Sequence, residues 1–162
     1  MVLNPHIHTR GVTVVEVMVS LFIFSLVLVF IFQTFTLFFN AQQRVLEHTQ
    51  ALFFAEEGIE ILKYIRDDDW VDIDSRTVGT RYYLAVASTT ASITTTPEVI
   101  DGRYTRSFIL RAGYRTAGND LVPSTTSGSS VDGDTYIVES YVNWGDGEEV
   151  ELQGLLTNIH DI

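Results

Sequence analysis

Cysteine and basic residues are scarce in this 162-residue chain, and each shortage excludes a class of function. The sequence contains no cysteine, so no disulfide bond crosslinks the fold and no thiol takes part in chemistry. Lys and Arg together number 10 against 21 Asp and Glu, which gives a formal net charge of -11. Because nucleic-acid affinity comes mostly from Lys and Arg that neutralise phosphates, this balance argues against nucleic acid as a partner.

Motifs of catalysis are missing as well. The sequence has no Gly-x-Ser-x-Gly elbow and no Gly-rich loop that would cradle a phosphate. Two of the four histidines fall within the first eleven residues, so the rest of the chain lacks a histidine cluster for catalysis or zinc binding: they are His6, His8, His48 and His160. The sequence therefore predicts a protein that is not an enzyme.

Charge is absent from one long stretch, between Glu16 and Arg44. Residues 12–39 within it are almost wholly apolar, and a membrane-spanning helix needs only about 20 such residues. Arg10 precedes the apolar run, so the positive-inside rule places the N-terminus in the cytoplasm and the C-terminal part outside. The sequence thus predicts a single-pass protein of the cytoplasmic membrane.

A cleaved secretory signal and a plain signal anchor are the simplest interpretations of such a run. A secretory signal has an apolar core of roughly 7–15 residues and a small-residue cleavage site, whereas this run is longer and no Ala-x-Ala pattern follows it. A signal anchor fits the length but does not explain Glu16. An acid within a membrane helix costs about 2.5–3.5 kcal/mol at the helix centre and usually marks a function.

The residues that open the run, Arg10, Gly11 and Val12 followed by Glu16, resemble the class III signal of type IV prepilins and bacterial secretion pseudopilins. The resemblance implies that a prepilin peptidase cuts after Gly11, that Val12 is then N-methylated, and that Glu16 becomes the fifth mature residue. The usual first mature residue is Phe, so Val12 departs from the pattern. Residues 51–60 and 66–70 also resemble minor pilins and minor pseudopilins.

The spacing between Val12 and Glu16 has a physical meaning in such a filament. The Glu16 carboxylate lies about one helical turn past Val12, where it can face the Val12 ammonium group of a neighbouring subunit. Opposite charges attract strongly in a low dielectric, and each one is costly if left unpaired there. The pair would set the axial register of packed helices. The implied partners are other pilin-like subunits, prepilin peptidase, the membrane platform of the assembly machine and, before assembly, the lipid bilayer.

Four segments follow from these patterns. Residues 1–11 form a prepilin leader, 12–40 a transmembrane or filament-core helix, 41–66 an amphipathic second half of that helix, and 67–162 an antiparallel β head with long loops. Many major pilins carry a Pro within the membrane run, and its absence here predicts a continuous helix. Residues 81–87, 104–112, 135–144 and 149–157 alternate as strands do. A roughly four-stranded sheet packed on the helix gives a pilin-like α+β fold.

Two groups of charged residues in the head suggest ligands, and each has a simpler explanation. Oxygen ligands for Ca²⁺ are offered by Asp132, Asp134, Asp146 and Glu148. Asp-Gly is first of all a turn dipeptide, so no cofactor is expected. A DNA-uptake or adhesion face is suggested by Arg103, Arg106, Arg111 and Arg115. Pairing with the abundant carboxylates is the favoured interpretation of these arginines.

The sequence leaves two functions open. The favoured one is a minor pilin or pseudopilin of a type IV pilus, secretion or DNA-uptake filament, whose head ends outside the membrane in a filament or at the cell surface. The alternative is a membrane-anchored extracytoplasmic binding or adhesion domain that does not assemble. Replacing Glu16 separates them, because only the assembling protein needs that carboxylate.

Overall fold

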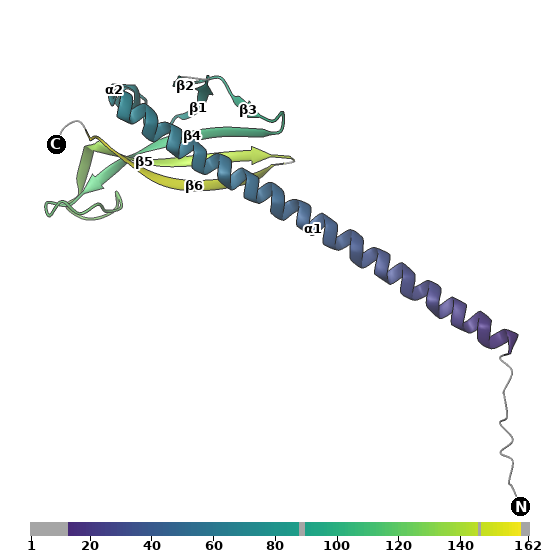
Figure 1. The fold of residues 1–162 in the computed structure, drawn as a ribbon. Helices are drawn as coiled ribbons and strands as arrows, with labels where there is room; N and C mark the ends of the chain where they lie inside the picture. Colours follow the sequence, from purple (N-terminus) through teal and green to yellow (C-terminus); the bar gives the residue numbers. More distant parts are fainter. Residues whose placement is uncertain (1–12, 88–89, 146, 160–162) are drawn as a thin grey trace, which may run out of the picture. The chain divides into compact units, whose positions relative to one another are not determined.

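The computed structural model describes residues 13–87, 90–145 and 147–159. The chain divides into two compact units, residues 1–45 and 46–162, and each is considered by itself. The elements follow in the order α1 (Val14–Asp68), α2 (Val71–Asp74), β1 (Arg81–Val86), β2 (Ala91–Thr94), β3 (Glu98–Ile100), β4 (Tyr104–Arg115), β5 (Ser130–Trp144) and β6 (Glu148–Thr157) (Figure 1). The α+β class predicted from the sequence is confirmed.

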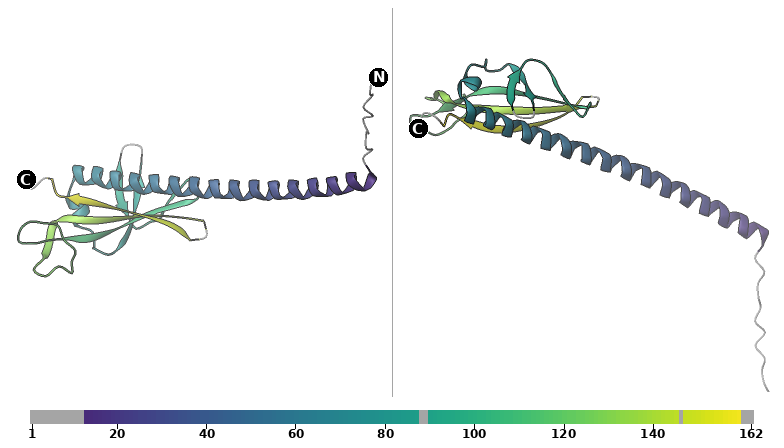
Figure 2. Two further views of the ribbon diagram at one scale, coloured as in Figure 1. Left: turned by 90° about the horizontal axis from the view of Figure 1, so that it is seen from below. Right: turned by 45° about the horizontal axis from the view of Figure 1, so that its top comes forward.

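Helix α1 is continuous over 55 residues, as the absence of proline predicted. The helix contains no proline, its first glycine is Gly58, and apolar residues occupy most of its positions. The part that belongs to the second unit, residues 46–68, lies across one face of the sheet (Figures 1 and 2). This amphipathic half therefore folds together with the head.

The sheet has six strands rather than the roughly four that were predicted. Its order is β2-β1-β4-β5-β6, and β3 pairs with β4 beside β1. All the pairings are antiparallel. The four predicted strands occur as β1, β4, β5 and β6. The two additional strands, β2 and β3, lie between β1 and β4 in the sequence, where one of the long loops of the head was expected. β2 and β3 are only four and three residues long, so their pairing with β1 and β4 decides their conformation more than their own alternation does.

The long hairpin of β4 and β5 contains an irregularity that corrects a second expectation. Ala112 pairs with Tyr136, whereas the next residue, Gly113, pairs with Asp132. The Asp132-Gly133-Asp134 stretch, expected to be a turn, therefore lies within β5, and residues 133–135 are an extra length of that strand that a bulge accommodates. A β-carbon on Gly113 would lie 2.7 Å from the Thr135 carbonyl oxygen, so this close approach requires glycine.

Small residues on α1 allow the helix to lie close to the sheet. Ala51, Ala55 and Gly58 are buried there, and a β-carbon on Gly58 would lie 3.0 Å from the Arg106 Cδ and 3.1 Å from the Ser140 Oγ. Larger apolar residues of the same helix then fill the core beyond Gly58. The main cluster of buried residues joins them to the sheet and to α2: Ile59, Leu62, Ile65, Ile73, Tyr82, Leu84, Phe108, Leu110, Tyr136, Val138 and Leu156.

Candidate functional site

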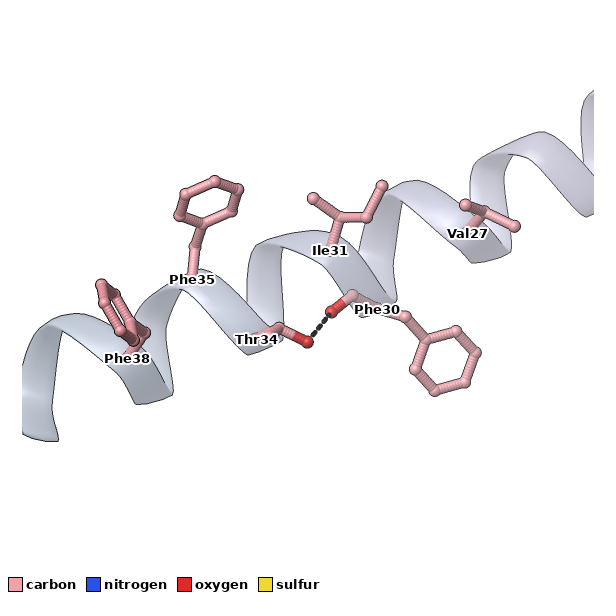
Figure 3. Close-up of a pocket in the computed structure, with 6 residues that line it drawn as sticks. All are labelled: Val27, Phe30, Ile31, Thr34, Phe35 and Phe38. Carbon is pink, nitrogen blue, oxygen red and sulfur yellow. Dashed lines mark hydrogen bonds between the residues drawn. The ribbon is translucent and has the colours of Figure 1, made fainter.

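The first unit of the described chain is an exposed apolar helix. Its large side chains project on all sides of α1, as Phe30, Phe35 and Phe38 do in Figure 3. A stretch near the start of α1 is long and apolar enough to cross a membrane by length and composition. Exposure of so many aromatic and aliphatic side chains to water is costly, so this surface calls for lipid or another apolar helix.

The few hydroxyl groups within this apolar stretch are satisfied inside the helix. Thr34 Oγ1 donates a hydrogen bond of 2.8 Å to the Phe30 carbonyl oxygen one turn earlier (Figure 3). Ser20, Ser25 and Thr36 donate in the same way to carbonyl oxygens three or four residues before them. A polar group without a partner is expensive in hydrocarbon, and these bonds remove that cost. The helix can therefore lie in a membrane or in a filament core.

Glu16 lies in the first turn of α1, where Thr13 caps the helix. The Glu16 backbone N–H donates to Thr13 Oγ1 at 3.3 Å, and the Val17 N–H donates to the Thr13 carbonyl oxygen at 3.2 Å. The Thr-x-x-Glu spacing is that of a capping box, a signal present in the sequence but not among the predictions. A carboxylate at this position also faces the positive end of the helix dipole. Glu16 thus has a local role in starting the helix besides any role between subunits.

A comparison with protein-family models decides what this N-terminal segment is. Residues 8–32 match the model described as the prokaryotic N-terminal methylation motif, which is characteristic of type IV pilins and pseudopilins. The chain carries a prepilin-type signal. Such a signal implies processing by prepilin peptidase and assembly with other pilin subunits. The matched segment includes Gly11 and Glu16, and it ends inside the apolar helix. No curated protein and no solved structure matches the chain.

The residues predicted to be processed lie outside the part of the chain that the structure describes. They are Arg10, Gly11 and Val12. Thr13 is the first described residue, and α1 begins directly after it. The prepilin-type signal at residues 8–32 therefore overlaps the first part of α1.

The predicted oxygen ligands are not gathered into one site. Asp132 accepts a hydrogen bond from Arg115 Nε. A hydrogen bond from the Thr135 side chain, together with this pair, lowers the pKa of Asp132. Asp134 accepts one from Asn158 Nδ2 at 3.3 Å. Glu148 pairs with Trp144 at the opposite end of β5, and Asp146 lies outside the described residues. Within residues 13–87, 90–145 and 147–159, no group of three acids, cysteines or histidines is placed to hold a metal ion.

The four arginines that suggested a DNA-binding face are each paired with a carboxylate. Their partners are Glu47 for Arg103, Glu98 and Glu57 for Arg106, Glu139 for Arg111, and Asp132 for Arg115. The bond to Glu47 raises the pKa of Arg103. Because each positive charge already has a nearby carboxylate, these residues do not form a basic surface for phosphates.

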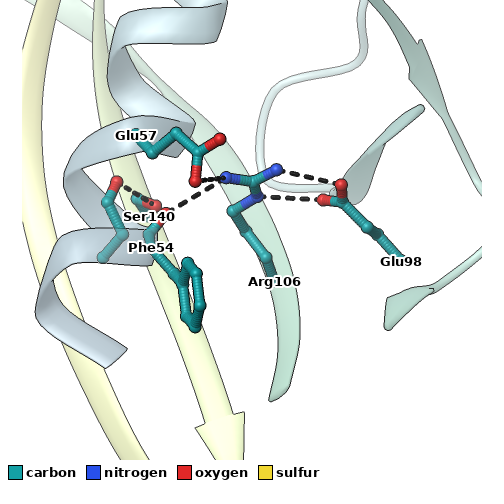
Figure 4. A network of polar contacts seen from close by, with 6 residues as sticks. Phe54, Glu57, Glu98, Arg106 and Ser140 are labelled. Carbon is teal, nitrogen blue, oxygen red and sulfur yellow. Dashed lines mark hydrogen bonds and ion pairs between the residues drawn. The ribbon is translucent and has the colours of Figure 1, made fainter. Parts of the chain in front are cut away.

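Arg106 joins α1 to the sheet from a buried position. Its side chain is only 3% exposed. The guanidinium donates to both carboxylate oxygens of Glu98 at 2.9 Å, lies 3.2 Å from the Glu57 carboxylate, and donates to the Phe54 carbonyl oxygen at 3.3 Å (Figure 4). Ser140 Oγ donates to the next helix carbonyl, that of Ala55, at 3.0 Å. These contacts hold the helix, β3 and β4 together.

The burial of Arg106 was readable in the sequence, although its partners were not. Tyr104, Arg106, Phe108 and Leu110 occupy one face of β4, and all four are buried. The period of two places an arginine inside an apolar stripe, and a buried arginine needs carboxylate or carbonyl partners. Glu57 and Phe54 lie about 50 residues earlier in the chain, so no local pattern indicates that they meet it.

Proposed function

We propose that this chain is a structural subunit, a minor pilin or pseudopilin, of a type IV pilus, secretion or DNA-uptake filament. Prepilin peptidase cuts it after Gly11, the new N-terminal Val12 is methylated, and the subunit assembles through α1. The observation that carries the proposal is the prepilin-type signal at residues 8–32, which runs directly into an exposed apolar helix. A chain of this kind performs no catalysis and needs no bound cofactor.

The same helix has two environments in this proposal. Before assembly it spans the cytoplasmic membrane once, with its N-terminus in the cytoplasm and the head outside. After assembly its apolar surface packs against helices of other subunits, and the Glu16 carboxylate meets the Val12 ammonium group of a neighbour. Both environments are apolar, so the transfer exchanges lipid contacts for protein contacts without exposing the apolar first part of α1 to water. The membrane platform of the assembly machine receives the subunit between the two states.

Mass spectrometry of the N-terminus tests the processing step. The full chain is expressed in a bacterial host with an active prepilin peptidase and in a matched host with an inactive one. We expect a mature chain that begins at Val12 and carries one additional methyl group in the first host, and an intact leader in the second. An intact leader in the host with active peptidase contradicts the proposal.

Fractionation tests assembly separately from processing. Filaments sheared from cells should contain the mature chain, whereas a membrane-anchored binding domain that does not assemble stays with the membrane fraction. Recovery of a processed chain only with membranes, in cells that make filaments, would favour that alternative function.

A further inference from the structure

One positive charge on α1 lacks a partner, although the other basic residues of the described chain have one. Lys63, Arg66, Arg103, Arg106, Arg111 and Arg115 pair with carboxylates, and Arg76 and Arg81 donate to a carbonyl and a hydroxyl oxygen. Arg44 is exposed and forms no hydrogen bond, ion pair or ring contact with the described residues. It is also the first charged residue after Glu16, so it ends the apolar run.

A carboxylate without a partner lies twelve residues further along the same helix. Glu56 is exposed and forms no contact of these kinds, whereas Glu47, Glu57 and Glu60 are each paired with a basic residue. Twelve residues of helix correspond to a rise of about 18 Å, which is too far for the two side chains to meet within one chain. Arg44 and Glu56 are therefore two complementary charges that only a second copy can bring together.

Glu56 lies in a setting that suits an arginine side chain. It lines a groove of about 260 Å³ between α1 and β6, together with Ile59, Leu152 and Leu155. Leu155 is 45% exposed and offers apolar surface to the methylene stem of an arginine. Gln153 also lines the groove and donates through Nε2 to Glu151, which leaves its own carbonyl oxygen available to accept. Glu60 and Lys63 line the same groove and pair with each other at 2.7 Å, so the lysine is already neutralised. The groove thus offers a guanidinium group apolar side chains and two oxygen acceptors.

We propose that Arg44 of one copy binds in the groove beside Glu56 of a second copy. The occupant is a second copy because an unpaired cation, Arg44, and an unpaired acid with a groove beside it, Glu56, both belong to α1, and a parallel copy shifted by about 18 Å along the helix axis brings them together. With the same shift of twelve residues, Ala41, which shares the helix face of Arg44, comes level with Phe53, which precedes Glu56 on the second copy. This inference rests on the proposed function, since it assumes packed parallel helices.

Disulfide crosslinking tests the contact directly, because the chain has no cysteine of its own. Two differently tagged full-length chains, Arg44→Cys and Glu56→Cys, are expressed together in cells that assemble filaments, and the filaments are then oxidised. We expect a heterodimer that reduction separates. The matched control pairs Arg44→Cys with Asp68→Cys, because Asp68 is also an exposed helix carboxylate that has no partner in the described part of the chain. Equal heterodimer yields for the two pairs, or none for either in recovered filaments, overturn the proposal.

Charge reversal provides a second, independent measurement. Arg44→Glu or Glu56→Arg alone should lower the amount of chain recovered in filaments about fivefold, which corresponds to about 1 kcal/mol for an exposed pair. The double variant Arg44→Glu/Glu56→Arg restores the pair between copies and should restore recovery. If Arg44 instead binds lipid headgroups or a different subunit, the double variant stays as poor as Arg44→Glu, and the proposal is wrong. Absence of the unmodified chain from filaments would contradict the proposed function itself.

Discussion

Arg106 and Glu98 lie directly opposite each other in the β3–β4 pair and share two hydrogen bonds, each of 2.9 Å. The guanidinium is buried against α1, so the pair ties a three-residue strand to the helix as well as to its neighbouring strand. Planar two-point recognition of this kind requires arginine, because lysine presents a single ammonium group. The short strand β3 depends on this contact more than on its own sequence.

Removing Arg106 should destabilise the head far more than removing an exposed arginine of the same strand. Arg106→Ala leaves the partly buried Glu98 carboxylate unpaired and two helix contacts unmade, and breaking a buried pair costs about 3–5 kcal/mol. Arg111→Ala is the matched control, since its pair with Glu139 is partly exposed and contributes about 0–1 kcal/mol. Urea unfolding of the full chain in detergent measures both. Equal losses of stability would show that Arg106 is not a structural anchor.

Gly113→Ala should disrupt the bulge between β4 and β5. The added methyl group would lie 2.7 Å from the Thr135 backbone carbonyl oxygen, and overpacking of this kind costs about 1–3 kcal/mol. Gly133→Ala, on the opposite strand of the same bulge, meets no atom within 4 Å and should change stability little. Thermal unfolding of the two variants provides the comparison, and a Gly133→Ala variant as unstable as Gly113→Ala would contradict the bulge geometry.

Tyr136 should make the head less stable in strongly alkaline solution. Burial, together with a 2.8 Å hydrogen bond to Asp74, raises the pKa of the Tyr136 phenol from 10.0 to about 12. The unfolded chain therefore loses this proton before the folded chain does, so the free energy of unfolding falls as the pH rises from about 10 to 12. Tyr136→Phe should flatten part of that fall, as urea unfolding across this pH range would show.

Tyr141 contributes to the same alkaline range, because burial and its bond to Glu139 raise the pKa of its phenol as well. Tyr136→Phe therefore removes only a part of the pH dependence. Asp74→Asn is the control that retains the phenol but removes the neighbouring negative charge. It lowers the pKa of Tyr136 in the folded chain toward the unfolded value, so the alkaline loss of stability should be smaller and should end at a lower pH. An unchanged pH profile in both variants would rule out the Tyr136–Asp74 bond as its source.

Glu16→Gln and Glu16→Ala separate the two roles of Glu16. Glutamine preserves a side chain that suits a capping box, whereas alanine does not, and neither carries the charge that the Val12 ammonium group requires. We expect both variants to be cut after Gly11 yet to be lost from filaments, as measured by N-terminal mass spectrometry and by fractionation. Normal assembly of Glu16→Gln would mean that assembly does not need the negative charge of Glu16, and that the side chain acts on its own helix and not between subunits.

The sequence predicted those features that depend on neighbouring residues. The apolar run without proline predicted a continuous α1, and alternation over residues 81–87, 104–112, 135–144 and 149–157 predicted β1, β4, β5 and β6. The Gly11–Glu16 spacing predicted the prepilin-type signal that the family comparison confirms. The Thr13-x-x-Glu16 cap was also present locally. Each of these patterns depends only on residues that are close together in the chain. A helix, a strand or a processing signal can therefore be recognised from it without knowledge of the tertiary structure.

Tertiary structure alone decided which distant residues meet. β2 and β3 exist because β1 and β4 supply their hydrogen-bonding partners, and Asp132-Gly133-Asp134 belongs to a strand because Gly113 allows a bulge opposite it. The four arginines that resembled a basic surface are neutralised by acids, two of which lie on α1 about 50 residues away. Contacts between such distant residues depend on how the helix packs on the sheet, and no periodicity in the sequence encodes that packing.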